Sequence, residues 1–264
     1  MKLAMMPGDT LAPDEVRKEG FEAVQMFFGG GADGDGKDPS AADVDGVLLA
    51  ADIALAAMTL HVDLVGPSGL VEAQVARAVR CVRKTAVLEG RYGDNPKPVL
   101  VWRPSQYPSG AEDGAVFRGL ISALSTVCAA AEDAGVAIAV EITRGGSVDS
   151  AERWLRLQDH VGSPALKVCL DAANFCPDRT PLERAVRVLG PDVVIAHGKD
   201  SSFHDNGEVA EYGPTGSGRL DYETYIRAVC DYCESPYFVM EYYRTRAQLL
   251  RARDIVLVAM DGKG

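Results

Sequence analysis

The sequence predicts an α/β fold, a single (β/α)8 barrel over residues 1–264. Three observations lead to this prediction. Short apolar runs that suit buried strands alternate with longer amphipathic segments that suit helices, which is typical of a parallel sheet. The alternation recurs about eight times along the chain. The length of 264 residues is close to that of one such barrel.

The expected elements follow one another in strict alternation. The apolar runs predict strands at 2–6, 22–27, 58–65, 98–103, 136–142, 166–171, 192–197 and 236–241. The helical patterns lie at 13–19, 43–56, 68–88, 114–134, 148–160, 181–189, 221–233 and 246–258. An open Rossmann-like sheet is the second choice, and the lack of a GxGxxG motif after the first strand argues against it.

Charge and composition restrict the partners. The formal net charge is −11, and no basic patch stands out, so we expect no nucleic-acid partner. No run of 18 uninterrupted apolar residues occurs, so we expect no membrane segment. The first residues lack the apolar stretch of a signal peptide, which favours the cytoplasm. The six cysteines are dispersed and are interpreted mainly as free thiols.

Four ionisable residues stand at the ends of the last four predicted strands. Glu141 follows VAIAV, Asp171 follows LKVCL, His197 follows DVVIA and Glu241 follows YFVM. Burying a charge in such a place is costly unless the charge is paired or binds a metal. In a barrel these strand ends converge, so the set predicts one divalent metal site. Salt bridges across the mouth of the barrel are the alternative.

The predicted ligand set selects the ion. Three carboxylates and one imidazole favour a hard or borderline divalent cation, with Mn²⁺ first and Mg²⁺, Co²⁺ or Zn²⁺ as alternatives. The set contains no cysteine, which argues against a structural zinc site.

Several longer motifs make a family resemblance specific. The runs are VEIT, LDAANF, AHGKDS, GPTGSGRLDYETYIRAV and VMEYY, all within residues 136–243. Together they resemble the xylose-isomerase-like TIM barrel superfamily, which includes ketose 3-epimerases, hydroxypyruvate isomerases, inosose dehydratases and endonuclease IV. Residues 1–135 agree only in general pattern. The resemblance implies the ligands Glu141, Asp171, His197 and Glu241, with Glu141 and Glu241 as the catalytic acid–base pair.

The resemblance also implies an activity. We expect a metal-dependent carbohydrate isomerase or epimerase that works through an enediolate, on a small sugar or keto-sugar. A lyase or dehydratase on keto-inositols or 3-keto-glycosides is the alternative on the same ligands. Two further classes are a non-catalytic sugar-binding barrel and a DNA-repair nuclease. The chain has only four histidines, which argues against the histidine-rich three-metal nuclease site. Homo-oligomers are common in this group.

Other strand ends supply candidate substrate contacts, each with a structural role as the alternative. These residues are His61, Trp102, Arg103, Asn174, Lys199 and Asp200. Two positions depart from the ketose 3-epimerase pattern. Asn174 stands where a histidine is usual, and Phe203 and His204 stand where an arginine is expected. The segment 198–219 is expected to be a long loop that closes over the site.

Overall fold

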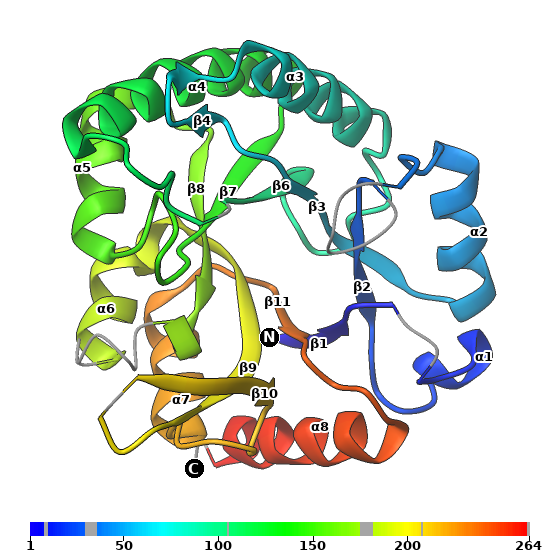
Figure 1. Ribbon diagram of the computed structural model, residues 1–264. Coiled ribbons are helices and arrows are strands. Elements are labelled where there is room, and N and C mark those ends of the chain that lie inside the picture. Colours follow the sequence, from blue (N-terminus) through cyan, green and yellow to red (C-terminus); the bar gives the residue numbers. More distant parts are fainter. Residues whose placement is uncertain (8–9, 30–35, 105, 175–181, 207, 263–264) are drawn as a thin grey trace. The chain divides into compact units, whose positions relative to one another are not determined.

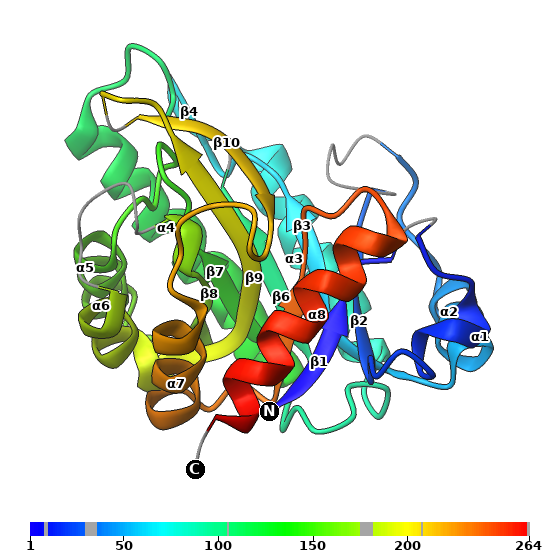
Figure 2. The ribbon, with the colours of Figure 1, turned by 90° about the horizontal axis from the view of Figure 1, so that it is seen from below.

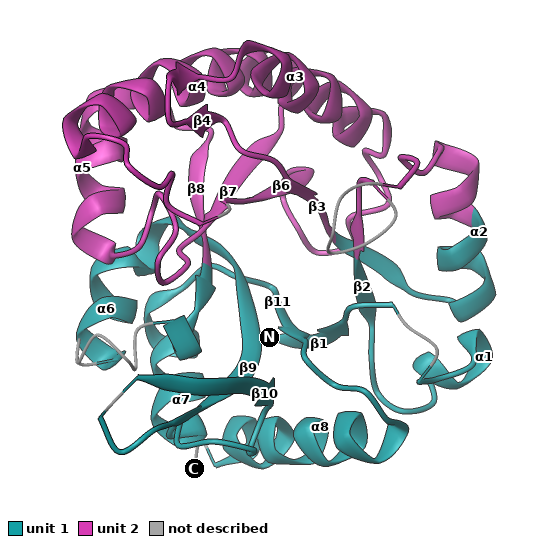
Figure 3. Ribbon diagram, viewed as in Figure 1, with its two compact units in different colours: residues 1–25, 46–56, 170–264 teal, residues 26–45, 57–169 magenta. Residues whose placement is uncertain are grey.

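The structure is a computed structural model that describes residues 1–7, 10–29, 36–104, 106–174, 182–206 and 208–262. The chain forms two compact units (Figure 3). Unit 1 contains residues 1–25, 46–56 and 170–264, and unit 2 contains residues 26–45 and 57–169. We describe each unit by itself. The expectation of one domain over residues 1–264 stays a prediction.

Unit 1 holds the first strand and the last strands of the chain. Its strands run in the order β10, β9, β11, β1 and the start of β2, and all neighbours are parallel except the β10–β9 pair (Figure 1). The elements are β1 (Lys2–Met5), α1 (Pro13–Val16), η1 (Ala172–Asn174), α6 (Leu182–Leu189), η3 (Gly190–Asp192), β9 (Val193–Phe203), β10 (Val209–Pro214), α7 (Tyr222–Tyr232), β11 (Tyr237–Met240) and α8 (Arg246–Asp261).

The helices of unit 1 follow from local capping and an apolar face. Asp221 and Thr245 are the N-caps of α7 and α8, and their side chains accept hydrogen bonds from the backbone N–H groups of Thr224 and Gln248. The two helices pack against each other (Figure 2), and α8 also packs on β11. The ring of Tyr225 on α7 meets that of Phe238 on β11 with centroids 5.5 Å apart, so this helix is fixed on the strands that carry the site.

Unit 2 holds the middle strands. The parallel pairs are β3–β6, β6–β7 and β7–β8. Between β3 and the next helix lies a small antiparallel pair. The elements wholly within this unit are β4 (Val65–Gly66), β5 (Gly69–Leu70), α3 (Glu72–Val87), β6 (Val99–Arg103), α4 (Asp113–Ala134), β7 (Ala137–Glu141) and α5 (Ala151–Val161).

Four elements pass from one unit to the other along the chain. They are β2 (Ala23–Phe27), α2 (Ala41–Ala51), β3 (Ala54–His61) and β8 (Leu166–Asp171). Within the described residues, eight strands of the parallel array are each followed by an α-helix, from β1 and α1 to β11 and α8. This alternation agrees with the predicted (β/α)8 fold class.

The boundary between α2 and β3 differs from the prediction of a helix over 43–56. The helix ends at Ala51 because Asp52 takes a left-handed backbone conformation, with φ of 52°. The N–H of Ile53 then donates to the carbonyl of Leu48, 3.2 Å away, which satisfies a carbonyl of the last turn. The strand therefore starts at Ala54. The apolar run itself suits a helix and a strand equally, so its pattern does not locate the boundary between them.

The segment 198–219 is not simply a loop. Strand β9 continues past His197 to Phe203 and pairs with β10 as an antiparallel hairpin. The expectation of an irregular loop is therefore wrong for most of this segment. The sequence hid the strands because the side chains that β9 buries past His197, those of Lys199, Asp200 and Ser201, are polar, and β10 is an edge strand.

A glycine next to this hairpin provides a test of its packing. A Cβ at Gly218 would lie against the carbonyl oxygen of Ser201 and Oδ1 of Asp200. We expect Gly218→Ala to destabilise the protein by about 1–3 kcal/mol, as overpacking does. Gly46→Ala is the control, since nothing lies within 4 Å of its Cβ in α2, and it should stabilise by about 0.5–1 kcal/mol. Denaturant unfolding measures both, and equal midpoints for Gly218→Ala and the wild type would contradict the packing.

Helix α4 is long and apolar enough to suit a membrane span by length and composition. Its apolar face is nevertheless used inside unit 2, where Phe117, Leu120 and Leu124 are buried and the helix packs on α3. Charged side chains such as Glu132 and Asp133 lie on the same helix. We therefore interpret α4 as a core helix.

Candidate metal centre

Three of the four expected ligands meet within unit 1. Asp171 is the last residue of β8, His197 lies within β9, and Glu241 directly follows β11. Their ligand atoms all lie within 4.8 Å of one another, and all three side chains are buried. Two carboxylates and an imidazole at this separation form a group that could hold a metal ion.

The imidazole of His197 is oriented by an amide. Its Nε2 lies 3.1 Å from Oε1 of Gln25, a buried residue on β2. Since the amide oxygen accepts, Nε2 carries the proton and Nδ1 carries the lone pair. Nδ1 lies 3.8 Å from Oε1 of Glu241, so the lone pair is on the side of the other two ligands. A hydrogen bond of this kind fixes the tautomer of a metal-binding histidine.

Backbone hydrogen bonds position the two acidic residues. Oδ1 of Asp171 accepts the N–H of Ala173 at 3.1 Å, in the short helix η1. The N–H of Glu241 donates to the carbonyl of Gly198 at 3.1 Å, which ties this residue to β9. The backbone thus holds the Asp171 carboxylate directly, whereas for Glu241 it fixes only the residue from which the side chain extends.

Lys199 brings a positive charge to the same carboxylates. Its Nζ lies 3.2 Å from Oε1 of Glu241 and in close contact with Oδ2 of Asp171. The side chain is 3% exposed. This ammonium offsets part of the negative charge that burial would otherwise make costly. The expected substrate-contact residue is therefore part of the charge balance of the ligand group.

Tyr225 joins the two strands that carry Asp171 and His197. Its buried hydroxyl donates to the carbonyl of His197 at 2.9 Å, and the carbonyl of Leu170 lies 3.3 Å from it. We expect Tyr225→Phe to cost about 1–3 kcal/mol of stability, because buried carbonyls lose their donor. Metal affinity should fall by up to about tenfold, as for outer residues that support ligands.

Calorimetric titration with Mn²⁺ and denaturant unfolding measure these two effects of Tyr225→Phe. Tyr232→Phe is the matched control, because its hydroxyl accepts from Arg187 at the exposed end of α7. It should change stability by less than about 0.5 kcal/mol. Identical behaviour of the two variants would mean that Tyr225 does not support the ligand strands.

Asp200 organises the chain that follows the hairpin. Its carboxylate accepts three backbone N–H groups, from Ser201 at 2.8 Å, Leu220 at 3.0 Å and Gly216 at 3.1 Å. Nearby, the hydroxyl of Tyr222 donates to the carbonyl of Lys199 at 2.7 Å, and burial raises the pKa of this phenol well above its ordinary value. These hydrogen bonds of Asp200 and Tyr222 fix the backbone at Lys199 and after it.

The fourth expected ligand lies in unit 2. Glu141 is the last residue of β7, is 3% exposed, and has Nε of Arg103 at 3.6 Å from its Oε1. In the β7–β8 register Glu141 is opposite Cys169. Arg103, one of the expected substrate contacts, is thus placed beside a predicted catalytic carboxylate.

The remaining expected contacts have structural partners of their own. Trp102 is 3% exposed, and its indole N–H donates to the carbonyl of Val62 at 3.0 Å. His61 at the end of β3 meets the ring of Phe27 edge-on at 5.7 Å. Asn174 is buried in η1 of unit 1. Their role in substrate binding stays a prediction.

Sequence reasoning missed several residues of this region. Gln25 is a polar residue inside the apolar strand AVQMF, which could have drawn attention to it. Tyr242 directly follows Glu241 and was part of a quoted motif. Tyr225 lies in the motif GPTGSGRLDYETYIRAV, whereas Tyr212 gave no such signal, because it lies in a segment expected to be a loop.

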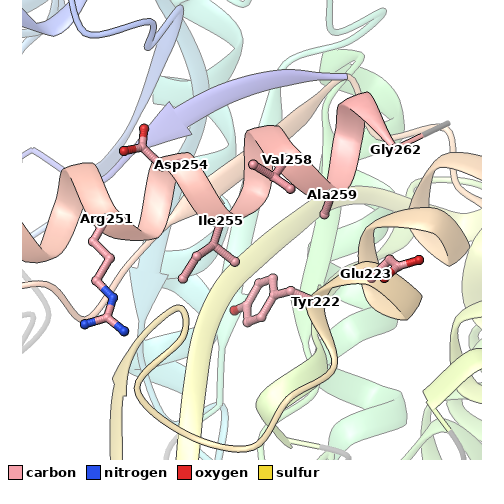
Figure 4. A pocket seen from close by; sticks show the side chains of 8 residues that line it. All are labelled: Tyr222, Glu223, Arg251, Asp254, Ile255, Val258, Ala259 and Gly262. Atoms are coloured by element: carbon pink, nitrogen blue, oxygen red, sulfur yellow. The ribbon is translucent and has the colours of Figure 1, made fainter. Parts of the chain in front are cut away.

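Unit 1 also has a groove of about 770 Å³ lined by residues of α7 and α8 (Figure 4). Its lining combines the ring of Tyr222 with apolar and charged side chains of α8, among them Ile255, Val258 and Arg251. No group of metal-ligating side chains among the described residues lines it. The candidate metal ligands of unit 1 therefore lie at the strand ends and not in this groove.

Comparison with known proteins agrees with the predicted fold class. The family model described as xylose isomerase-like TIM barrel matches residues 13–257. The chain belongs to the xylose isomerase-like TIM barrel family. Its fold is accordingly the closed (β/α)8 barrel that the sequence predicts. Among curated proteins, none matches this sequence.

Solved structures of this family share the fold at low sequence identity. A xylose isomerase domain protein from Alicyclobacillus acidocaldarius is 18% identical with a TM-score of 0.72, covering 98% of this chain and 99% of the other. A probable 3-DHS dehydratase, AsbF from Bacillus anthracis, is 14% identical with a TM-score of 0.72 and covers 98% of each chain. A D-psicose 3-epimerase determined with D-fructose is 14% identical with a TM-score of 0.68, covering 99% and 98%.

These similar proteins of the family include epimerases and a dehydratase. Membership in the family therefore suggests an enzyme and leaves the reaction open. The reaction therefore has to be inferred from the residues of this chain.

Proposed function

We propose that this protein is a metal-dependent carbohydrate isomerase or epimerase. The observation that carries the proposal is the group formed by Asp171, His197 and Glu241, whose ligand atoms lie within 4.8 Å of one another in a buried place. A divalent ion held there, Mn²⁺ first and Mg²⁺, Co²⁺ or Zn²⁺ as alternatives, would polarise a sugar carbonyl and stabilise negative charge on its oxygens.

The residues fit such an ion. Two carboxylates and one imidazole are the donors that hard and borderline divalent cations take. Gln25 holds the proton of His197 on Nε2 and leaves Nδ1 for the ligand group. The ammonium of Lys199 partly neutralises the two carboxylates, which reduces the repulsion between them before an ion binds.

We propose Glu141 as the fourth ligand. The family resemblance suggests this role, and the strand register supports it. Glu141 pairs with Cys169 on β8, and Asp171 lies two residues further along that strand. Since side chains alternate between the faces of a strand, Cys169 and Asp171 share a face.

Glu141 and Glu241 would move the protons. One carboxylate removes a proton from the carbon next to the carbonyl, the C–H electron pair forms a C=C bond, and the carbonyl pair moves to oxygen. The other glutamate, in its acid form, returns a proton. Return to the opposite face of the same carbon gives the epimer. Return to the neighbouring carbon, with transfer of the hydroxyl proton, gives the aldose–ketose pair.

The same residues could support elimination. If the carbon beyond the enediolate carries a leaving group, the carbonyl would re-form and a C=C bond would form toward that carbon. The leaving group would depart with its bonding electrons and take a proton from the glutamate in its acid form. The product would be an unsaturated ketone, and the enzyme a dehydratase or lyase. Keto-inositols and 3-keto-glycosides are substrates of this kind. This alternative uses the same ligands and the same proton acceptor, so the product distinguishes it.

A substrate panel tests the proposal. Purified protein with Mn²⁺ is incubated with ketoses, keto-inositols and 3-keto-glycosides, and products are separated by chromatography and identified by NMR. We expect epimer or isomer from a ketose, and no product after treatment with EDTA. Dehydrated or cleaved products alone would favour the lyase. No turnover of any compound by protein that holds stoichiometric metal would contradict the enzyme proposal.

Further assignments remain part of the proposal. The substrate contacts are His61, Trp102, Arg103, Asn174, Lys199 and Asp200, with Asp200 acting through the backbone it holds. The partner is a small carbohydrate, without nucleic acid or membrane. A cytoplasmic location and a homo-oligomer are expectations.

A further inference from the structure

Two tyrosines of unit 1 flank the ammonium group of Lys199. Its Nζ lies 5.0 Å from the ring centroid of Tyr212 and 5.1 Å from that of Tyr242. The two rings lie 5.9 Å apart with their planes inclined by 59°. The same ammonium contacts Asp171 and Glu241, so this aromatic pair, Tyr212 and Tyr242, stands directly beside the ligand group.

The position of Tyr242 is unusual for its residue type. It has φ of 61°, in the left-handed region, where a bulky side chain is an outlier. Strained backbone of this kind persists where the surroundings fix it, and it is most frequent at functional sites. The ring is also 44% exposed, although it is a large aromatic side chain. The fold thus places an accessible ring immediately after a metal-ligand candidate.

The position of Tyr212 is fixed by the hairpin. It pairs with Ser201 in the β10–β9 register, and the next two residues of β10 pair with Asp200 and Lys199. Asp200 in turn holds the turn after the hairpin through Gly216 and Leu220. Tyr212 therefore stands on rigid backbone, as a binding residue requires.

We propose that Tyr212 and Tyr242 form an aromatic subsite that binds the C–H face of a ring-closed carbohydrate, beside the ammonium of Lys199. The inference rests on the proposed function and narrows its substrate class. A pyranose or cyclitol ring has one face rich in C–H groups, which packs on an aromatic ring, while its hydroxyls are suitable acceptors for an ammonium. A short open-chain substrate lacks such a face and would gain little from the pair.

Ligand binding measured by saturation-transfer NMR tests the subsite without requiring turnover. The probes are D-fructose, methyl β-D-glucopyranoside and myo-inositol, with dihydroxyacetone as the open-chain comparison, all with Mg²⁺ present. In the wild type we expect transfer to the ring C–H protons and weak transfer to dihydroxyacetone. Tyr212→Leu and Tyr242→Leu should each weaken ring-sugar binding by about 5- to 10-fold, which corresponds to the loss of one aromatic contact.

Three comparisons separate binding from folding. Tyr212→Phe and Tyr242→Phe keep the rings and should bind within about twofold of the wild type, with an unchanged Tm. Tyr232→Leu removes a ring at the end of α7, whose centroid lies 5.0 Å from Cζ of Arg187. This variant should not affect sugar binding. Mg²⁺ affinity of the leucine variants should stay within about twofold, since neither tyrosine is a proposed ligand.

The outcomes distinguish this subsite from the proposed function. Wild-type turnover with unchanged KM in both leucine variants would overturn the subsite and leave the function intact. Ring-sugar binding that depends on the two rings, without turnover of any sugar, would support the subsite and contradict the function. No ring-sugar binding by the wild type would also overturn the subsite, and the pair would then only cover Lys199.

Discussion

Asp171→Ala should abolish stoichiometric Mn²⁺ binding and all metal-dependent turnover. Asp171 is fully buried, and its ligand atom lies within 4.8 Å of those of His197 and Glu241. Removal of a residue that only supports a ligand lowers metal affinity by about 10- to 100-fold. Removal of a ligand should cost more, so we expect Mn²⁺ affinity to fall by at least about 100-fold. Isothermal titration calorimetry measures the change.

Stability gives a second readout of the same variant. Binding to the native state alone stabilises the wild type by about 2.7 kcal/mol at an ion concentration 100 times Kd, and the Tm should rise accordingly. The variant should lose this increment. Asp171→Asn keeps the size and shape of the side chain and removes its charge. It therefore tests the loss of the ligand in a variant that is less disturbed in its folding than Asp171→Ala. Glu223→Gln is the matched control, because this carboxylate is 73% exposed on α7, and it should bind Mn²⁺ normally. Stoichiometric Mn²⁺ retained by both Asp171 variants would refute the site.

Glu241→Gln and Glu141→Gln should each lower kcat by about 10²- to 10⁴-fold, the contribution of general acid–base catalysis. The amide keeps the size of the side chain and removes the proton acceptor. In the wild type, solvent deuterium should enter the carbon next to the sugar carbonyl. Activity assays and NMR in D₂O measure the two effects.

The control for the two glutamine variants is Glu211→Gln, an exposed carboxylate on β10 that should leave kcat unchanged. If turnover proceeds in D₂O without deuterium in the product, a hydride shift replaces the enediolate mechanism. If either glutamine variant keeps wild-type kcat, that glutamate is not part of the acid–base pair.

The strand ends were predictable because parallel strands impose a simple rule. An ionisable residue after an apolar run is expected at the end of a buried strand, which holds for Glu141 and Asp171, whereas β9 continues past His197. Asp171, His197 and Glu241 nevertheless meet in unit 1. The boundary at Asp52 was not predictable in the same way. A single left-handed residue ends α2 there, inside an apolar run that has no periodicity to locate it.

The supporting contacts depend on tertiary structure and were out of reach of sequence patterns. Gln25 and His197 are 172 residues apart in sequence, and their hydrogen bond forms only when β2 and β9 are in place. The pairing of β9 with β10 gives Tyr212 its position beside Lys199, and polar edge strands carry a weak sequence signal. Family resemblance supplied the ligand roles, whereas the aromatic pair came from the structure.

Anomalous diffraction at the manganese edge, from crystals soaked in Mn²⁺, is the most direct test of the central claim. We expect one strong peak, from an ion bound by Asp171, by His197 through Nδ1 and by Glu241, with Glu141 as the fourth ligand. A strong peak elsewhere, or none here at saturating Mn²⁺, would contradict it.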